Sequence, residues 1–360
     1  MKNGNLNKAV CLLLLAASVL SACAAIRSEG GGKEVPAVIR STEQKADAES
    51  VAEIKSLSAA TDTLTLWSTY WDNDNDLSVM REMAGNYEDI SLFAAYYTDG
   101  KIAVPEATTR SLSELRRKRL TEDKEIYLSV VNDSVRNSKT EQKSSKLLWE
   151  LIGTRESAAV HARELVDLAV RNGYDGIEID YENIRDDLEL WDAFITFEEY
   201  LLAASKKAGL KVRILLEPLT PMSELSGRFP EGPEYVIMCY NLHGGGTEPG
   251  PKADPDFLAE IYEKFKSLPN TSYGLANGGY EWTENEKKAV QIKRAKIERI
   301  LSEQKKAPIR DDKSKALYFS YELKGKEHII WYADEVTLSE WAKKLTELSG
   351  EKVRISYWRL

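Results

Sequence analysis

Three acidic side chains alternate with apolar side chains in one short segment of the chain. The acids are Glu178, Asp180 and Glu182, and the apolar residues between them are Ile177, Ile179 and Tyr181. A period of two is typical of a β-strand, so the segment predicts a strand with one acidic face and one apolar face. Neighbouring carboxyl groups in a protein interior can act as general acid and base, which makes this strand the first candidate for an active site.

The segments on either side predict that this strand is buried. An amphipathic helix precedes it, with its apolar stripe at Ala158, Ala162, Leu165 and Ala169 and its end at Asn172–Gly173. A second helix is predicted over 187–208. Helix, strand, helix is the order of a βα repeat, in which the strand lies in the interior. Because buried carboxylates are costly unless they have partners, three of them in a row favour catalysis over a structural role.

Eight strand-like segments alternate with helical segments along the chain. They are 64–70, 90–97, 126–131, 174–182, 212–217, 235–240, 272–275 and 353–358. This pattern predicts an α/β fold, a (β/α)8 TIM barrel with its site at the carboxyl ends of the strands. The stretch 284–334 is too long for one crossover and predicts a small α+β insertion between the seventh and eighth strands. No helix is predicted after the eighth strand, and a short apolar stripe at Val51, Ile54 and Leu57 is one candidate for covering that seam.

Residues suited to binding a sugar follow several of these strands. They are Tyr70, Trp71, Glu217, Tyr240, Asn241, Tyr280, Trp282 and Trp358. Aromatic rings at a barrel mouth can stack on the CH-rich faces of sugar rings. The alternative for each aromatic residue is packing beneath a loop.

The first residues of the chain predict a bacterial lipoprotein signal peptide. Lys2 and Lys8 precede an apolar run over 10–20, and Leu20–Ser21–Ala22–Cys23 matches the lipobox. We therefore expect a signal peptide over 1–22 and a lipid on Cys23, which would anchor the protein to a membrane outside the cytoplasm. The alternative is an ordinary secretory signal. Residues 23–60 are predicted to form a flexible tether, and residues 61–360 the catalytic barrel.

Composition excludes several other functions. The net charge is −9, and removal of Lys2 and Lys8 with the signal peptide brings it to −11, which argues against a nucleic-acid partner. Only Cys239 would remain unmodified, so no intramolecular disulfide is expected. The three histidines lack metal-ligand spacing, and we expect no metal, no cofactor and a monomeric protein.

The acidic strand resembles a signature of a known enzyme family. Residues 175–182, Asp-Gly-Ile-Glu-Ile-Asp-Tyr-Glu, resemble the DGxDxDxE motif of glycoside hydrolase family 18. The family includes chitinases, endo-β-N-acetylglucosaminidases and the peptidoglycan hydrolases of the spore cortex and spore germination. Weaker matches follow in the right order over residues 62–358, and those at Tyr96–Gly100 and Asn132 are closest to the spore branch.

The resemblance implies a role for each motif residue. Glu182 would be the general acid and base, and the sugar's own 2-acetamido group would be the nucleophile, giving retention of configuration. Asp180 would orient the acetamide with help from Glu178, and Tyr240 would donate to its oxygen. The resemblance also assigns Asp175 and Tyr96 to substrate binding. Trp358 would form the floor of the pocket.

The sequence departs from the family pattern at two positions. Glu178 stands where the family usually has Asp, and Asn241 where it usually has Asp beside the tyrosine. These departures keep open a non-catalytic glycan-binding lipoprotein as the alternative to an O-glycosyl hydrolase. A purely structural lipoprotein would leave the acidic strand face unexplained. For the enzyme, peptidoglycan, chitin and N-glycans remain possible substrates, all with β-1,4 linkages next to N-acetylglucosamine.

Overall fold

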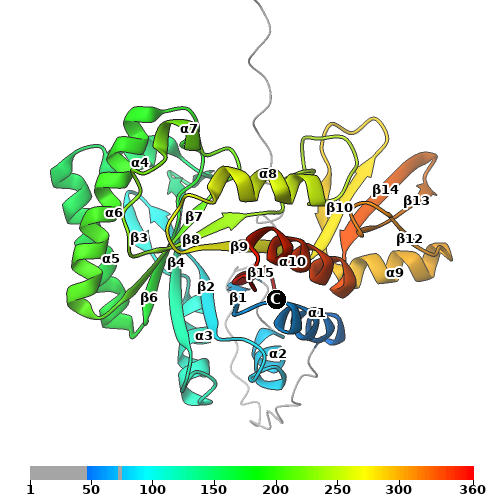
Figure 1. Ribbon diagram of the computed structural model, residues 1–360, viewed down its shortest axis with the longest axis horizontal. Helices are drawn as coiled ribbons and strands as arrows, with labels where there is room; N and C mark the ends of the chain where they lie inside the picture. Colours follow the sequence, from blue (N-terminus) through cyan, green and yellow to red (C-terminus); the bar gives the residue numbers. More distant parts are fainter. Residues whose placement is uncertain (1–46, 72–74) are drawn as a thin grey trace, which may run out of the picture.

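Eight parallel strands close into a barrel in the computed structural model, which describes residues 47–71 and 75–360. Each strand pairs with the next along the chain, and the last pairs with the first (Figure 1). The strands are β1 (Leu64–Thr69), β2 (Asp89–Thr98), β4 (Glu125–Arg136), β6 (Gly176–Asp180), β7 (Lys211–Leu216), β8 (Glu234–Met238), β9 (Thr271–Ala276) and β15 (Ile355–Trp358). The predicted (β/α)8 barrel is confirmed.

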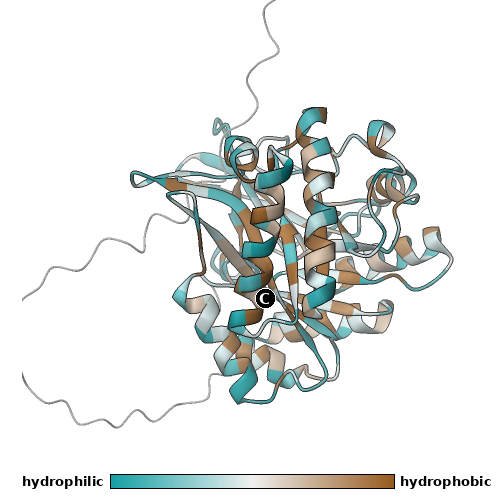
Figure 2. Cartoon of the chain, turned by 90° about the vertical axis from the view of Figure 1, so that its left-hand side faces the viewer, coloured by the Kyte–Doolittle hydropathy of each residue, from teal (hydrophilic) through white to brown (hydrophobic). Residues whose placement is uncertain are grey.

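Helices cover the outside of this barrel. They are α2 (Asp76–Glu82), α3 (Glu106–Arg117), α4 (Ser145–Ile152), α5 (Arg155–Asn172), α6 (Leu188–Ala208), α7 (Met222–Leu225), α8 (Pro255–Phe265) and α10 (Glu335–Ser349). Figure 2 shows polar and apolar residues alternating along the outer helices, as expected for helices that pack one face on a sheet. Helix α5 begins with a capping box at Thr154 and ends at Gly173 in the left-handed region, so both predicted helices around β6 are present. In the described part of the chain, no helix is long and apolar enough to cross a membrane.

Two short hairpins extend the barrel beyond its carboxyl end. Strand β3 (Lys101–Ala103) pairs with the end of β2, and β5 (Lys139–Glu141) pairs with the end of β4. The segment that follows β5 therefore begins above the mouth of the barrel, next to the end of β6.

The insertion before β15 is a separate five-stranded antiparallel sheet. Its strands are β10 (Gly278–Thr283), β11 (Val290–Ile292), β12 (Ile309–Arg310), β13 (Leu317–Leu323) and β14 (Lys326–Ala333), with helix α9 (Arg294–Gln304) against it. It forms the right-hand side of the molecule in Figure 1. The sheet begins at Gly278, before the expected boundary at 284, because the chain leaves β9 and enters β10 after a single residue.

A helix from the amino-terminal side covers the seam of the barrel. Helix α1 (Ala48–Ala60) packs against α10 and, more lightly, α2, the place of the helix that would follow the eighth strand. It buries Val51, Ile54 and Leu57, the stripe noted in the sequence. Residues 48–60 are therefore an ordered part of the barrel rather than tether, and of the predicted tether only 23–46 lies outside the described residues.

The barrel interior contains a buried ion pair between adjacent strands. Arg213 of β7 lies opposite Glu178 of β6, and both side chains are fully buried. Arg213 Nε is 3.0 Å from Glu178 Oε2; the N–H is not aligned for a hydrogen bond, so this is a contact ion pair. The Glu178 Oε1 atom accepts from Trp67 and Ser91, each at 2.6 Å. This set of contacts compensates the charge of Glu178 inside the barrel.

We predict that this ion pair holds the barrel interior together. The variant Arg213→Met should lower the free energy of unfolding by about 3–5 kcal/mol, because it leaves the Glu178 carboxylate buried without its cation. The double variant Glu178→Gln/Arg213→Met should lose less than the sum of the two single variants. Urea unfolding measures all three. The control is Lys211→Met, on the same strand as Arg213, whose exposed side chain pairs with Glu125 of β4. An equal loss in the control would contradict the prediction.

Candidate active site

The two faces of β6 separate acidic and apolar side chains as predicted. Ile177, Ile179 and Tyr181 belong to the main hydrophobic core beneath the outer helices. The acids face the barrel: Glu178 is fully buried, Asp180 is 6% exposed, and the side chain of Glu182 is 11% exposed. Glu182 thus lies at the rim, neither turned outward nor sealed from solvent.

Two neighbouring groups contact the carboxyl group of Glu182. Lys143, from the segment after β5, forms an ion pair and hydrogen bond through Nζ with Glu182 Oε2. Glu217, directly after β7, also lies within hydrogen-bonding reach of Glu182. Burial raises the pKa of Glu182 to about 7, with Lys143 opposing the shift and Glu217 adding to it. The group is therefore divided between its acid and base forms near neutral pH, as a proton donor and acceptor requires.

Asp180 lies below Glu182, and the cation that acts on it, Lys143, is paired with Glu182. Burial and the negative charge of Glu182 raise its pKa well above the usual range, while Lys143 opposes this. Among the described residues its Oδ1 atom is buried without a hydrogen-bond partner. A buried acceptor of this kind can receive a donor from a ligand.

Tyr240, from the end of β8, completes this group of side chains. Burial and the negative charges of Asp180, Glu182 and Glu178 raise the pKa of its phenol well above the usual range, so it remains a hydrogen-bond donor.

The backbone of Glu182 is held in place by an asparagine. Asn132 of β4 accepts from Glu182 N and donates to Glu182 O, both at 3.0 Å. The next residue, Asn183, has a left-handed backbone with φ of 65° and donates from N to Glu217 Oε2 at 2.8 Å. These contacts continue the order of β6 beyond its last paired residue and fix the direction of the Glu182 side chain.

Aromatic rings form an apolar layer around Trp358 at the mouth. The Trp358 ring lies edge-to-face with Trp67 and Phe93, with centroid distances of 5.7 and 4.9 Å. Trp358 and Tyr240 pack on the same interior cluster, which contains Trp67 and Met238. The structure thus places the Trp358 ring among aromatic side chains at the mouth, and its role as the floor of a pocket stays a prediction.

The aromatic residues after β1 and on β2 lie at the same end of the barrel. Tyr70 stacks edge-to-face on Trp71, a residue that is 47% exposed and whose ring centroid lies 5.7 Å from that of Phe93. Burial raises the pKa of the Tyr70 phenol, and Tyr96 lies close enough to Tyr70 to add to this shift. The structure thus groups these three predicted residues on one side of the mouth.

The insertion contributes one predicted residue to the site and uses another for support. Tyr280 lies close enough to Lys143 and Tyr240 to act on them electrostatically. Trp282 is buried and donates from its indole nitrogen to Thr247 O at 2.8 Å, so it anchors the loop after β8. Asn241, at the start of that loop, is exposed.

The assignment of Asp175 to substrate binding is wrong. This residue precedes the first residue of β6 and lies at the amino end of the strand, opposite the mouth. Its carboxylate pairs with Arg116 at 2.5 Å and accepts from Ile126 N at 2.9 Å. These contacts join α3 to the strands, so Asp175 has a structural role. The predicted lipid site Cys23 lies outside the described residues.

Sequence reasoning missed several residues that shape this site. Lys143 is 39 positions before Glu182 in a loop, where no local pattern signals it. Trp67 and Arg213 face the barrel interior from strands; a charged residue inside the apolar run 212–216 was a signal that could have revealed Arg213. Within the residues described, no cluster of His, Cys, Asp and Glu side chains is placed to hold a metal ion.

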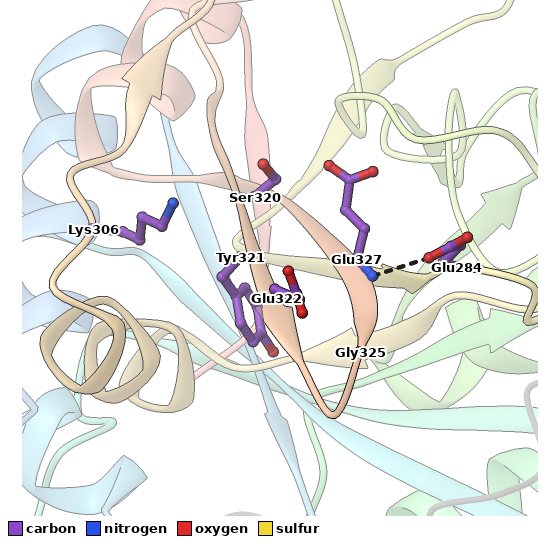
Figure 3. A pocket seen from close by; sticks show the side chains of 7 residues that line it. All are labelled: Glu284, Lys306, Ser320, Tyr321, Glu322, Gly325 and Glu327. Atoms are coloured by element: carbon purple, nitrogen blue, oxygen red, sulfur yellow. Dashed lines mark hydrogen bonds between the residues drawn. The ribbon is translucent and has the colours of Figure 1, made fainter.

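A surface pocket of about 420 Å³ lies on the insertion rather than at the barrel mouth (Figure 3). Its lining is polar and includes Glu284, Lys306, Glu322 and Glu327, and Glu327 N donates to Glu284 Oε2 at 3.3 Å. None of its lining residues belongs to the predicted site. The chemistry described above therefore rests on the barrel mouth and not on this pocket.

Solved structures share the fold of this chain. The spore cortex-lytic enzyme SleL of Bacillus megaterium QM B1551 aligns with a TM-score of 0.67 and 16% identity, over 83% of this chain and 70% of that chain. A chitinase from Chromobacterium violaceum ATCC 12472 aligns with a TM-score of 0.65 and 16% identity, over 82% of this chain and 93% of that chain. A family GH18 chitinase from Cycas revoluta, in complex with allosamidin, aligns with a TM-score of 0.63 and 13% identity, over 82% of this chain and 94% of that chain.

Comparison with protein-family models gives no match, and comparison of the sequence with curated proteins gives none either. The similarity is therefore one of structure. This chain has the (β/α)8 barrel fold found in GH18 chitinases and spore cortex-lytic enzymes.

Proposed function

We propose that this protein is a glycoside hydrolase of the GH18 type that cleaves β-1,4 linkages next to N-acetylglucosamine. The main support is the environment of Glu182, a rim carboxyl whose pKa is raised to about 7, directly above a buried Asp180 with an unpartnered oxygen. The shared fold with chitinases and cortex-lytic enzymes supports the same class. The Cycas revoluta chitinase also has a structure in complex with (GlcNAc)3, which supports a glycan of N-acetylglucosamine as the substrate.

The reaction begins with proton transfer from Glu182 to the glycosidic oxygen. As the bond from C1 to this oxygen breaks, the carbonyl oxygen of the substrate's 2-acetamido group forms a bond to C1, giving an oxazolinium ion. The acetamido N–H is the natural donor for the unpartnered Oδ1 of Asp180, and Tyr240 donates to the acetamido oxygen. Water then attacks C1 while Glu182 takes its proton, so that one water is consumed and the configuration is retained.

A non-catalytic glycan-binding protein remains the second candidate. The ion pair between Lys143 and Glu182 favours it, because the lysine stabilises the ionised carboxylate, and only the neutral acid can donate a proton. Turnover of a defined oligosaccharide distinguishes the two functions.

We predict that Glu182→Gln abolishes hydrolysis of chitooligosaccharides and peptidoglycan glycan while leaving glycan binding largely intact. The amide keeps the shape of the side chain but cannot transfer the proton. Asp180→Asn should cost less, on the order of 10²-fold in kcat. Mass spectrometry of the products, with high-mannose N-glycan as a third substrate, measures turnover and identifies the polymer. Hydrolysis by Glu182→Gln at nearly the wild-type rate would refute the assignment of the acid.

We predict that kcat/KM falls as the pH rises above about 7. Glu182 must carry its proton in the free enzyme, and this form is lost as the pH passes its pKa of about 7. The groups that face Glu182 are Lys143, Asp180, Glu217 and Tyr240. Initial rates at low substrate from pH 5 to 9 give the profile; a rate that stays constant through pH 8 argues against Glu182 as the acid.

We infer that the enzyme is a lipoprotein of the bacterial cell envelope. The support is the order of charge, apolar run and Leu20–Ser21–Ala22–Cys23 at the beginning of the sequence. We expect cells that produce the full chain to incorporate labelled palmitate into it, and Cys23→Ser to prevent the incorporation. Labelling that survives this substitution would exclude Cys23 as the modified residue.

A further inference from the structure

The position of Lys143 places a cation where the leaving sugar must lie. Lys143 Nζ hydrogen-bonds Glu182 Oε2, the group that protonates the glycosidic oxygen. A proton donor must come within about 3 Å of the oxygen that it protonates, so Nζ lies within roughly 6 Å of the scissile oxygen. The Lys143 side chain is 40% exposed, so it is not sealed from a substrate that enters the mouth.

The backbone of Lys143 is held firmly for a loop residue. Its φ is 51°, in the left-handed region of backbone conformation that is unfavourable for residues other than glycine. Its N–H donates to Asp133 Oδ1 at 2.9 Å, and its carbonyl accepts from Asn183 Nδ2 at 3.1 Å. Asn183 follows Glu182 directly, so these bonds tie the position of the lysine to that of the acid.

The charge of Lys143 works against the proposed reaction unless the substrate supplies an anion. Burial opposes the charged form, but the negative charges of Glu182, Glu217 and Asp180 raise the pKa of Lys143, so it stays protonated. It therefore stabilises ionised Glu182, whereas proton transfer needs neutral Glu182. A carboxylate that entered with the leaving sugar would give the lysine a new partner, and Glu182 would then take up a proton more readily.

Resting on the proposed hydrolase function, we propose that Lys143 makes the enzyme selective for glycans whose leaving sugar carries a carboxylate beside the scissile oxygen. In a β-1,4 linkage that oxygen is on C4, so the carboxylate belongs to a substituent at C3 or C5. The 3-O-lactyl group of muramic acid places a carboxylate at C3, and a uronic acid carries its carboxylate on C5. In intact peptidoglycan the lactyl carboxyl is an amide of the stem peptide, so the first source requires an amidase to act beforehand.

Four oligosaccharide probes of equal length test the proposal, and each contains a β-1,4 linkage in which C1 belongs to N-acetylglucosamine. They are a chitooligosaccharide, a peptide-free muramic-acid glycan, the same glycan with its lactyl carboxyls converted to methylamides, and a hyaluronan oligosaccharide. The methylamide is the matched neutral control for the charge. Each probe is assayed with wild type, Lys143→Met, Lys143→Arg and Lys139→Met. The last of these removes an exposed lysine from the adjoining β5 hairpin, away from Glu182.

We expect wild type to cleave at least one carboxylate probe about 10- to 100-fold better in kcat/KM than the neutral probes, as for a hydrogen bond between charged groups. Lys143→Met should remove this preference and move the alkaline limb of the chitooligosaccharide pH profile upward. Lys143→Arg should keep part of the preference, and Lys139→Met all of it. Equal cleavage of the carboxylate and methylamide probes by wild type, or an equal loss on all probes in Lys143→Met, would overturn the proposal.

A binding measurement separates this proposal from the hydrolase function on which it rests. If wild type cleaves none of the probes, the hydrolase function fails. Calorimetry with Glu182→Gln, with and without Lys143→Met, still measures whether the carboxylate glycan binds better than its methylamide. A preference that requires Lys143 supports carboxylate recognition, and the absence of one refutes it.

Discussion

The contact between Glu178 and Arg213 is the constraint on which the rest of the site depends. A barrel interior excludes water, so a strand with three acids on its inner face needs compensation within the barrel. Arg213 supplies it at the deepest position, from the strand next to β6 and in register with Glu178. Lys143 supplies a second cation at the rim. Asp180 lies between these two levels, and its burial together with the negative charge of Glu182 raises its pKa.

The contacts of Glu178 also explain how a glutamate fits at position 178, where the family pattern usually has an aspartate. Its carboxylate reaches three groups, Trp67, Ser91 and Arg213, on strands on both sides of β6. A side chain so fully engaged acts as a fixed negative support beneath Asp180. The longer glutamate is therefore compatible with the role that the family pattern assigns to this position.

Local sequence patterns predicted most of the fold, whereas they did not predict which side chains from distant segments contact each other. The alternation over 177–182 was enough to place three acids inside a barrel, and the order of the eight segments was enough to predict its topology. The partners Arg213 and Lys143 depend on strand register and on a loop conformation, which leave no periodic trace in the sequence. Asp175 shows the opposite error: it belongs to the motif, but strand direction places it at the other end of the barrel.

The covering of the seam by α1 has a consequence for how the chain reaches its folded state. Tyr357 of β15 donates a hydrogen bond to Glu53 of α1, 304 positions away, and Asn277 donates to the same carboxylate. Contacts with so large a sequence separation form late, because the intervening chain must first be ordered. A barrel without β15 is therefore open between β9 and β1, and α1 can reach its final position only after this gap has closed.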